Sequence, residues 1–419
     1  MIKQENIDRI ISDVSIRDVA IDEGITFSKE RGGKLWACCP FHNENTPSFF
    51  VDTGTNTWKC YGGCHSGGNV ISLYRKLKND LPFPIACKEL AKKYLNEDIE
   101  DDYKPSKEDE EKQKEKESLQ IILSYVQEFY VQCIHEVNPA ANKARETVRK
   151  RWGADAIERF GIGYAPRDGF IEWAMRKGLD FDLLEQVGLI GIGERGKYAM
   201  LRDRYTIPIY DKMSNVIGFT ARTMSDDKDI CKYLNLKNSL VYAKDKSVFG
   251  INFAQKEARL KNKFYLVEGA PDVVKLQSLE ILNTVASLGG AWTENQLKQL
   301  YHISHTVTFI PDADTLKPGN EWPAGTANVF ANGREALAAG FTVNVREIPI
   351  DYPAPKKEDP DSWIVDKAHF QQMKEEEFIY WFCRRRYWPT ADDIEQMTTE
   401  DRLKAIADIC SLLMMIRDE

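Results

Sequence analysis

Long apolar stretches are missing from this chain. No run of about 18 apolar residues occurs, so the sequence predicts no transmembrane helix. The first five residues, Met1 to Glu5, also lack the apolar centre of a secretory signal. From these two absences we expect a cytoplasmic protein with no membrane partner.

Cysteine is scarce as well. Nine cysteines among 419 residues are too few and too scattered for a disulfide scaffold. Five of them stand in apolar or amphipathic surroundings, and we expect them to be small buried hydrophobic residues: Cys87, Cys133, Cys231, Cys383 and Cys410. The other four lie close together, between positions 38 and 64.

An excess of positive charge is the third absence. The net charge of −8 argues at first against a nucleic-acid partner. However, residues 97–117 hold eleven acidic residues and five lysines, which contribute −6 and leave −2 for the rest of the chain. This charged stretch cannot bury a core, so we expect a linker there. An acidic metal site would account for part of the remaining negative charge.

The pattern of apolar residues divides the chain into segments. Over 263–350 short apolar strands alternate with helical stretches, which predicts right-handed crossovers and a largely parallel sheet. Before this region, 205–210 and 216–220 are typical of two paired strands around a turn. The sequence thus predicts a multidomain α/β (α+β) protein with a small N-terminal domain over 1–96, the linker over 97–117, a mixed α+β subdomain over 118–260, a parallel-sheet subdomain over 261–364 and a short helical tail over 365–419.

The clustered cysteines form two close pairs with a histidine. Two residues separate Cys39 from His42, and three residues separate Cys60 from Cys64. Zinc prefers four such donors in a tetrahedron, and two pairs on turns supply them. Buried free thiols beside an unrelated histidine are the alternative. Cys38 and His65 neighbour the predicted ligands, and either could replace one of them.

Acidic residues follow three predicted strands. Glu268 comes after 264–267, Asp312 and Asp314 come after 306–310, and Asp359 and Asp361 come after the strand that ends near 350. In a parallel sheet these positions converge on one edge. A lone Asp-x-Asp often serves only as a turn or a helix cap, but crowded carboxylates are suited to holding Mg²⁺ or Mn²⁺. Two such ions are suited to phosphoryl transfer.

These motifs carry a family resemblance over roughly residues 30–95 and 160–362. Cys39-Pro-Phe-His42, Asn45-Thr-Pro-Ser-Phe49, Trp58-Lys-Cys60 and Gly67-Gly-Asn-Val70 resemble the zinc-binding module of DnaG-type primases. Leu266 to Val274, Val285 to Gly289 and Asp359-Pro-Asp361 resemble the primase version of the Toprim domain, and Tyr205 to Ile209, Gly218 to Arg222 and Lys232 to Asn235 resemble the segments before it.

Two features depart from the family pattern. The gap between Cys60 and Cys64 is one residue longer than usual. About ten extra residues, Thr315 to Gly325, follow the Asp-x-Asp motif, and we hypothesise that this loop contacts the incoming nucleotide or a partner.

The resemblance implies a DNA primase, which makes short RNA primers on single-stranded DNA for replication. It implies Glu268, Asp312 and Asp314 as catalytic carboxylates, with Asp359 and Asp361 completing a magnesium or manganese site that Asp272 assists. It also implies that template or nucleotide phosphates are bound by Arg204, Arg222, Lys232 and Lys244.

The same resemblance implies cofactors and partners. The cofactors are one structural zinc ion, with Cys39, His42, Cys60 and Cys64 as ligands, and two or more catalytic Mg²⁺ or Mn²⁺ ions. The partners are the single-stranded template, ribonucleoside triphosphates and a replicative helicase. We expect a monomer in the cytoplasm of a bacterium, encoded by the chromosome, a phage or a mobile element.

Two alternative functions belong to other classes. One is a Toprim nuclease or topoisomerase, although no motif marks the nucleophilic tyrosine that a topoisomerase needs. The other is a non-catalytic, zinc-dependent protein that binds single-stranded DNA. The intact acidic clusters argue against this second alternative.

Overall fold

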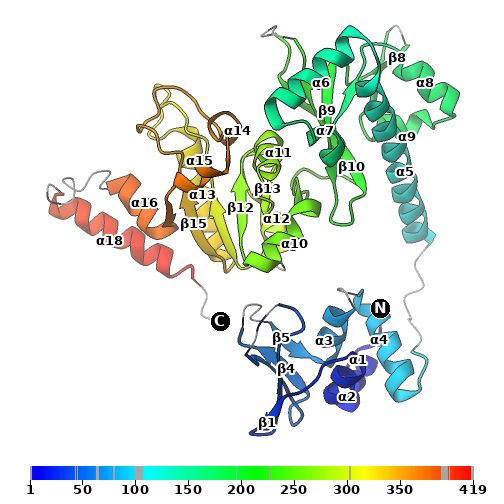
Figure 1. The fold of residues 1–419 in the computed structure, drawn as a ribbon, viewed down its shortest axis with the longest axis vertical. Coiled ribbons are helices and arrows are strands. Elements are labelled where there is room, and N and C mark those ends of the chain that lie inside the picture. Colours follow the sequence, from blue (N-terminus) through cyan, green and yellow to red (C-terminus); the bar gives the residue numbers. More distant parts are fainter. Residues whose placement is uncertain are drawn as a thin grey trace. The chain divides into compact units, whose positions relative to one another are not determined.

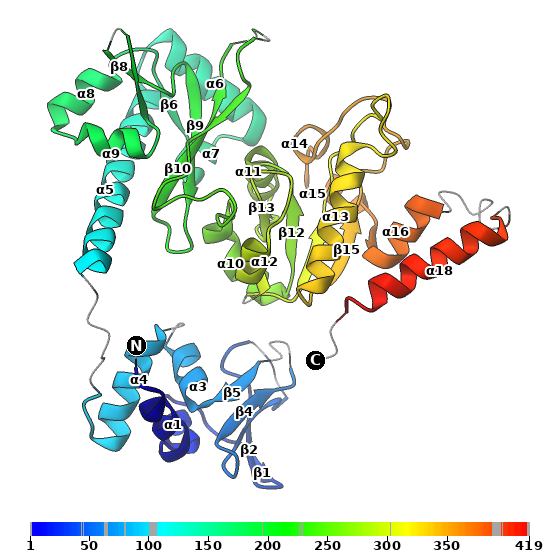
Figure 2. The same ribbon diagram turned by 180° about the vertical axis from the view of Figure 1, so that it is seen from behind.

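The computed structural model describes residues 2–42, 44, 46–62, 66–78, 81–99, 107–194, 196–225, 227, 229–301, 303–387, 395 and 397–416. The chain divides into two compact units, 1–112 and 113–419 (Figures 1 and 2). The division falls inside the stretch 97–117 that composition marks as a linker.

The first unit contains an antiparallel sheet whose five strands lie in chain order: β1 (Lys29–Arg31), β2 (Lys34–Ala37), β3 (Phe49–Asp52), β4 (Thr57–Cys60) and β5 (Gly67–Asn69). Side chains of β4 alternate between exposed and buried, which places Trp58 and Cys60 on the core side. The core also includes Phe49 and Phe50, whereas Tyr61 is exposed and packs on Phe50.

Helices pack beside this sheet (Figures 1 and 2). They are α1 (Gln4–Asp13), α2 (Ile16–Asp22), α3 (Val70–Leu77), α4 (Phe83–Leu90) and the π-helical turn η1 (Ala91–Leu95). Asn69 caps α3, because its side-chain oxygen accepts a hydrogen bond from Ser72 N. Helix α4 continues directly into the π-helical turn η1.

The second unit begins with mixed helices and antiparallel strands. Its helices are α5 (Lys107–His135), α6 (Pro139–Trp152), α7 (Ala156–Phe160), α8 (Phe170–Lys177) and α9 (Phe181–Gln186). A four-stranded sheet has the order β11 (Tyr233–Asn235), β10 (Val216–Thr223), β9 (Arg204–Tyr210) and β6 (Gly163–Ala165), and a separate hairpin joins β7 (Ile190–Gly193) to β8 (Gly196–Ala199). The predicted strand pair is confirmed as β9 and β10.

A largely parallel sheet follows, in the order β13 (Thr284–Ala286), β12 (Phe264–Val267), β14 (Thr306–Phe309), β15 (Thr342–Arg346) and β16 (Glu375–Glu377). The first four strands are parallel, as predicted, and β16 is antiparallel to β15. The connecting helices are α10 (Ile251–Lys261), α11 (Ala270–Ser278), α12 (Glu294–Tyr301) and α13 (Ala324–Ala338). Figure 2 shows α13 lying along β15.

Two apolar cores hold the second unit together. One contains Ile207 and Phe219 from the antiparallel sheet as well as Val267 and Ile310 at the ends of parallel strands, so it passes from one sheet to the other without a break. The other core lies against the opposite face of the parallel sheet and contains Phe264.

The last segment differs in part from the helical tail that the sequence predicts. After α14 (Pro360–Trp363), which precedes this segment, it contains α15 (Lys367–Gln372), α16 (Phe378–Tyr387) and α18 (Thr399–Leu413), but also the strand β16. Phe378 and Trp381 of α16 are buried in the second core. The sequence pattern missed β16 because three consecutive glutamates, Glu375 to Glu377, lack the apolar residues expected of a strand.

The predicted multidomain α/β (α+β) class is confirmed, and two smaller expectations need revision. Cys231 and Cys410 are exposed rather than buried, since Cys231 lies in the loop before β11 and Cys410 lies on an exposed side of α18, whereas Cys87, Cys133 and Cys383 are buried as expected. Among the described residues, no helix is long and apolar enough to cross a bilayer.

Candidate functional sites

Three of the four predicted zinc ligands lie together beside the first unit's sheet. Ligand atoms of Cys39, His42 and Cys60 all lie within 4.8 Å of one another. Cys60 ends β4, and Cys39 follows β2. Cys64 and His65 lie outside the described residues. Cys38 is exposed and does not belong to this group, so the geometry favours Cys39 as the ligand.

A glutamate that the motif analysis did not single out lies beside these three residues. Glu44 Oε2 is 2.9 Å from His42 Nε2, and Glu44 Oε1 accepts a hydrogen bond from Cys39 N at 2.7 Å. Ser48 Oγ donates to the same carboxylate and is 3.2 Å from Cys60 Sγ. Glu44 thus contacts Cys39 and His42 directly and is linked to Cys60 through Ser48. Two soft thiol donors and an imidazole are the donor set that zinc prefers.

The acidic residues of the second unit meet at the carboxyl edge of its parallel sheet. Glu268 directly follows β12, and Asp312 and Asp314 follow the adjacent strand β14. Asp312 is 9% exposed, and its buried Oδ1 has no hydrogen-bond partner among the described residues. A buried carboxylate oxygen without a donor is costly unless a cation satisfies it. This oxygen therefore fits a divalent cation.

Burial and mutual repulsion change the acidity of this cluster. Burial, together with the charge of Glu268, raises the pKa of Asp312 to about 7. Burial also raises the pKa of Glu268, and the charge of Asp314 adds to this effect. A bound cation would remove the repulsion between these carboxylates, which is a second reason why they fit a magnesium or manganese site.

Helix α13 and the loop before it hold the Asp-x-Asp segment in place. Asp314 Oδ2 accepts a hydrogen bond from Gly325 N, near the start of α13, at 2.9 Å. A side-chain carbon at Gly325 would lie 2.3 Å from the backbone oxygen of Asp312, so only glycine allows this approach. Asn328 Nδ2, one turn further on, is 3.5 Å from Glu268 Oε1.

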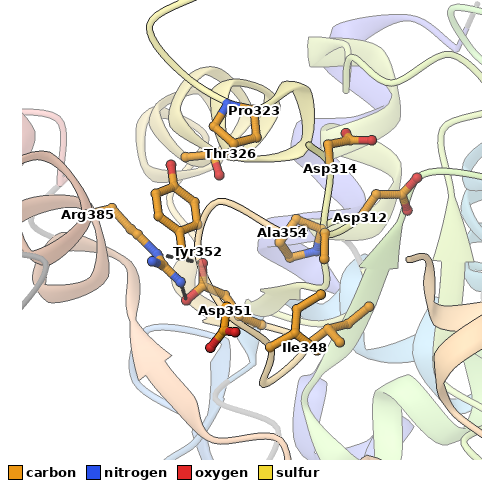
Figure 3. A pocket seen from close by; sticks show the side chains of 13 residues that line it. Asp312, Asp314, Pro323, Thr326, Ile348, Asp351, Tyr352, Ala354 and Arg385 are labelled. Atoms are coloured by element: carbon orange, nitrogen blue, oxygen red, sulfur yellow. Dashed lines mark hydrogen bonds and ion pairs between the residues drawn. The ribbon is translucent and has the colours of Figure 1, made fainter. Parts of the chain in front are cut away.

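The opposite side of the Asp-x-Asp segment borders a small pocket. In Figure 3 the carboxylates of Asp312 and Asp314 point away from Tyr352 and Arg385, which line the other side of this pocket. The Arg385 guanidinium stacks 3.9 Å from the centre of the Tyr352 ring and forms two hydrogen bonds with Glu347. Helix α16 is thus bound firmly to the loop after β15.

Asp361 has partners that the sequence did not reveal. Its Oδ2 accepts a hydrogen bond from Arg151 Nε at 2.6 Å, and its Oδ1 accepts one from Trp152 Nε1 at 2.5 Å. Arg151 Nη1 also donates to the hydroxyls of Tyr205 and Tyr233. Both Asp361 oxygens are therefore engaged by α6, and this carboxylate connects the two subdomains.

Asp272 and Asp359 both lie close enough to Asp312 and Asp361 to interact electrostatically with them. Both Asp272 oxygens accept backbone hydrogen bonds, from Gly269 N at 3.1 Å and from Asp361 N at 3.2 Å. Asp359 caps α14 through Ser362 N at 2.7 Å, and its charge contributes to the raised pKa of Asp312, after burial and Glu268. The structure thus groups Glu268, Asp312 and Asp314 with Asp359 nearby, while Asp272 and Asp361 are tied to the surrounding backbone and to α6.

The four predicted basic residues do not form a single group. Arg222 and Lys232 line one open groove together with Lys143 and Thr147 of α6. Arg204 is 7% exposed beneath this groove, where Nη1 donates to the carbonyls of Ala221 and Lys232, at 3.2 and 3.4 Å.

Lys244 lies apart from that groove. It is exposed, and its side-chain stem lies against Gly289 in the loop after β13.

Two basic residues near the carboxylates were not predicted from the sequence. The run Arg149-Lys-Arg151 in α6 could have pointed to Arg151, and the position two residues before Asp359 could have pointed to Lys357, which is described below.

Comparison with known proteins agrees with this geometry. Residues 2–107 match the family model of the CHC2 zinc finger, and residues 130–255 match that of the DNA primase catalytic core, N-terminal domain. The chain is 32% identical over 377 residues to a DNA primase of Pseudomonas putida, covering 87% of this chain and 53% of that protein. It therefore spans about half the length of that relative.

Solved structures show the same fold. The zinc-binding and RNA polymerase domains of the Aquifex aeolicus primase superimpose with a TM-score of 0.54 and 26% identity, covering 96% of this chain and 95% of that one. A DnaG primase catalytic domain bound to single-stranded DNA superimposes with a TM-score of 0.59 and 25% identity, covering 73% of this chain and 95% of that one.

Proposed function

Because the chain belongs to the DnaG-type primases, we propose that it synthesises short RNA primers on a single-stranded DNA template. The observation that carries this proposal is the convergence of Glu268 and Asp312 from adjacent parallel strands, with a buried Asp312 oxygen for which the described part of the chain supplies no donor. Such an edge is suited to nucleotidyl transfer, in which charge on a phosphate must be stabilised.

We infer a division of labour among the segments. The N-terminal domain, 1–96, would hold zinc through Cys39, His42, Cys60 and Cys64 and take part in template recognition. The subdomain 118–260 would carry the template groove, which Arg222 and Lys232 line. The subdomain 261–364 would carry the acidic edge, which Glu268, Asp312, Asp314 and Asp359 form. The similarity to a catalytic domain whose structure holds single-stranded DNA supports a DNA template here.

The carboxylates would do the chemical work at the acidic edge. Glu268, Asp312 and Asp314, with Asp359, would hold Mg²⁺ or Mn²⁺, which supplies Lewis-acid stabilisation of the transferring phosphate when bound. Their anchoring by α13 keeps the oxygens in place, so little reorganisation is needed during the reaction. Asp361 would contribute mainly by fixing the loop of Asp359 against α6.

Arg222 and Lys232 would bind phosphates of the template or nucleotide, because they line an open groove. Arg204 would support this groove from below, since its guanidinium is directed to backbone carbonyls. Lys244 lies beside the loop after β13 and would contact the nucleotide separately. Ribonucleoside triphosphates as substrates, a helicase partner and a monomeric state stay predictions of the family resemblance.

The decisive experiment is a primer-synthesis assay with the purified chain, single-stranded DNA, ribonucleotides and Mg²⁺ or Mn²⁺. We expect short RNA products that Asp312→Asn reduces by about 100-fold or more, as expected when a principal charge-stabilising group is lost. Asp168→Asn is a matched control, because Asp168 is exposed just before α8. Full activity of Asp312→Asn, or cleavage of the DNA in place of RNA synthesis, would contradict the proposal.

A further inference from the structure

A lysine lies across the opening of the acidic edge. Lys357 Nζ is 2.8 Å from Asp312 Oδ2 and 2.8 Å from Asp314 Oδ1. The lysine side chain is 55% exposed, whereas the two carboxylates are 9% and 12% exposed. The ammonium group therefore approaches from the solvent and ends between the two carboxylates of the Asp-x-Asp motif.

The backbone fixes this lysine in place independently of its side chain. Ala313 N donates to Glu358 O at 2.8 Å, and Glu358 N donates to Ala313 O at 3.0 Å. This small antiparallel bridge joins the Asp-x-Asp segment to the segment before α14. Residue 357 thus stays beside Asp312 and Asp314 whatever side chain it carries.

The positive charge of Lys357 offsets the negative charges of Asp312 and Asp314. Among the described basic residues, Arg151 pairs with Asp361, and Lys357 pairs with Asp312 and Asp314. A divalent cation can use Oδ1 of Asp312, but at Asp314 it needs Oδ1, the oxygen that Lys357 contacts, because Oδ2 already accepts a hydrogen bond from Gly325 N; the lysine and the cation thus compete for the two carboxylates. An ammonium and a metal ion cannot both occupy them at contact distance, because two cations would repel each other strongly there.

We propose that Lys357 is a resident counter-ion of the acidic edge, which a divalent cation must displace from Asp312 and Asp314. Lys357 is thus a positioning residue that sets the cation concentration at which the site fills. It keeps the two carboxylates neutralised and in place when no divalent cation is bound. This inference rests on the proposed function, since it assumes that these carboxylates bind Mg²⁺ or Mn²⁺.

The test measures Mn²⁺ binding to the full chain, by titration calorimetry or by the electron paramagnetic resonance signal of free Mn²⁺. Lys357→Met removes the competing ammonium, so we expect Mn²⁺ to bind roughly three- to tenfold more tightly, as the loss of two partly exposed ion pairs allows. Lys357→Arg keeps a cation at this position and should stay close to the unchanged protein.

The adjacent lysine offers a matched control. Lys356 is 81% exposed and pairs with Glu358 at 3.0 Å, so Lys356→Met removes the same charge without freeing Asp312 or Asp314. We expect its Mn²⁺ affinity to change less than about twofold, because solvent and salt screen an exposed charge. An equal rise in both methionine variants would mean a general charge effect and would overturn the inference, as would an unchanged or weaker affinity of Lys357→Met.

Thermal unfolding without and with Mn²⁺ gives a second readout. Without Mn²⁺, Lys357→Met leaves the carboxylates repelling one another, so its Tm should fall below that of the unchanged protein. Added Mn²⁺ should then raise its Tm more than that of the unchanged protein, because tighter binding stabilises the folded state more. A Tm that responds to Mn²⁺ identically in both proteins would count against Lys357 as a competitor.

Asp312→Asn separates this inference from the proposed function. If Mn²⁺ binding is lost in Asp312→Asn but is the same in Lys357→Met and the unchanged protein, the acidic site stands and only the role of Lys357 fails. If the unchanged protein and Lys357→Met bind Mn²⁺ no better than Asp312→Asn does, the proposed metal site is wrong, and the inference fails with it.

Discussion

At the scale of single residues, carboxylates of similar sequence context do different work. Asp312 has one buried oxygen with no donor in the described part of the chain, and its other oxygen contacts the displaceable ammonium group of Lys357. Asp361, from an equally suggestive Asp-Pro-Asp motif, has both oxygens bound by Arg151 and Trp152. A motif gives the type of residue at a position, but the partners of each oxygen depend on segments about two hundred residues away in the sequence.

This difference predicts the effect of Asp361→Ala. The substitution leaves the Arg151 guanidinium, whose side chain is 21% exposed, without its carboxylate partner. We expect the free energy of unfolding of the second unit to fall by about 3 kcal/mol, as when one member of a buried ion pair is removed. Chemical denaturation followed by circular dichroism measures this change.

An exposed ion pair provides the comparison for Asp361→Ala. Glu294→Ala removes a partner of Lys298 on the surface of α12, and an exposed pair of this kind contributes about 0.5 kcal/mol or less. If Asp361→Ala destabilised the protein no more than Glu294→Ala, its contact with α6 would not be a structural brace.

At the scale of elements, the start of α13 positions the acidic edge. Its backbone reaches Asp314 through Gly325 N and touches the backbone of Asp312. The eleven residues from Thr315 to Gly325 allow the chain to leave the sheet and return at this point. In the structure this loop connects the Asp-x-Asp segment to α13. Its predicted contact with nucleotide or a partner stays a prediction.

Gly325→Ala tests this arrangement. The new methyl group would lie 2.3 Å from Asp312 O, so the helix or the Asp-x-Asp segment must move. We expect a loss of stability of about 1–3 kcal/mol, typical of overpacking, and a loss of Mn²⁺ affinity. Denaturation and the Mn²⁺ titration described above measure both effects.

Gly193→Ala serves as the control, because its added carbon would lie 3.4 Å from Tyr198 Cε1, an ordinary contact. A Gly325→Ala protein with unchanged Mn²⁺ affinity and stability would show that this close approach is not needed.

The sequence predicted most strands of the parallel sheet because they are short apolar runs between helical segments. Glu268, Asp312 and Asp314 could be placed together from chain order alone, since parallel strands share a carboxyl edge. The roles of Arg151 and Lys357 could not be predicted, because both depend on tertiary contacts. Arg204 could not be distinguished from Arg222 for the same reason, as both belong to strands of one sheet, and only burial separates them.

At the scale of the whole molecule, the chain forms two compact units with separate cores. In the first unit, the predicted metal ligands come from the segments that follow β2 and end β4, so metal binding should contribute to its stability. Removing zinc with a chelator should therefore unfold this unit at a lower temperature, while the unfolding of the second unit stays unchanged. Calorimetry with zinc analysis measures this, and Cys60→Ser should reproduce it without chelator.

In that experiment Cys87→Ser is the appropriate control, because Cys87 is buried in the same unit but lies outside the metal-ligand group. It should lower stability without releasing zinc. A chelator that left the unfolding of the first unit unaffected would contradict a structural zinc ion.

The unbroken core between the antiparallel and parallel sheets limits how the second unit can adapt. Because Ile207, Phe219, Val267 and Ile310 belong to one packed cluster, the two sheets cannot swing apart without opening that cluster to water. The groove lined by Arg222 and Lys232 therefore keeps a constant spacing from the acidic edge. If the template binds in this groove, as proposed above, the same nucleotide position of the strand would always lie at the carboxylates.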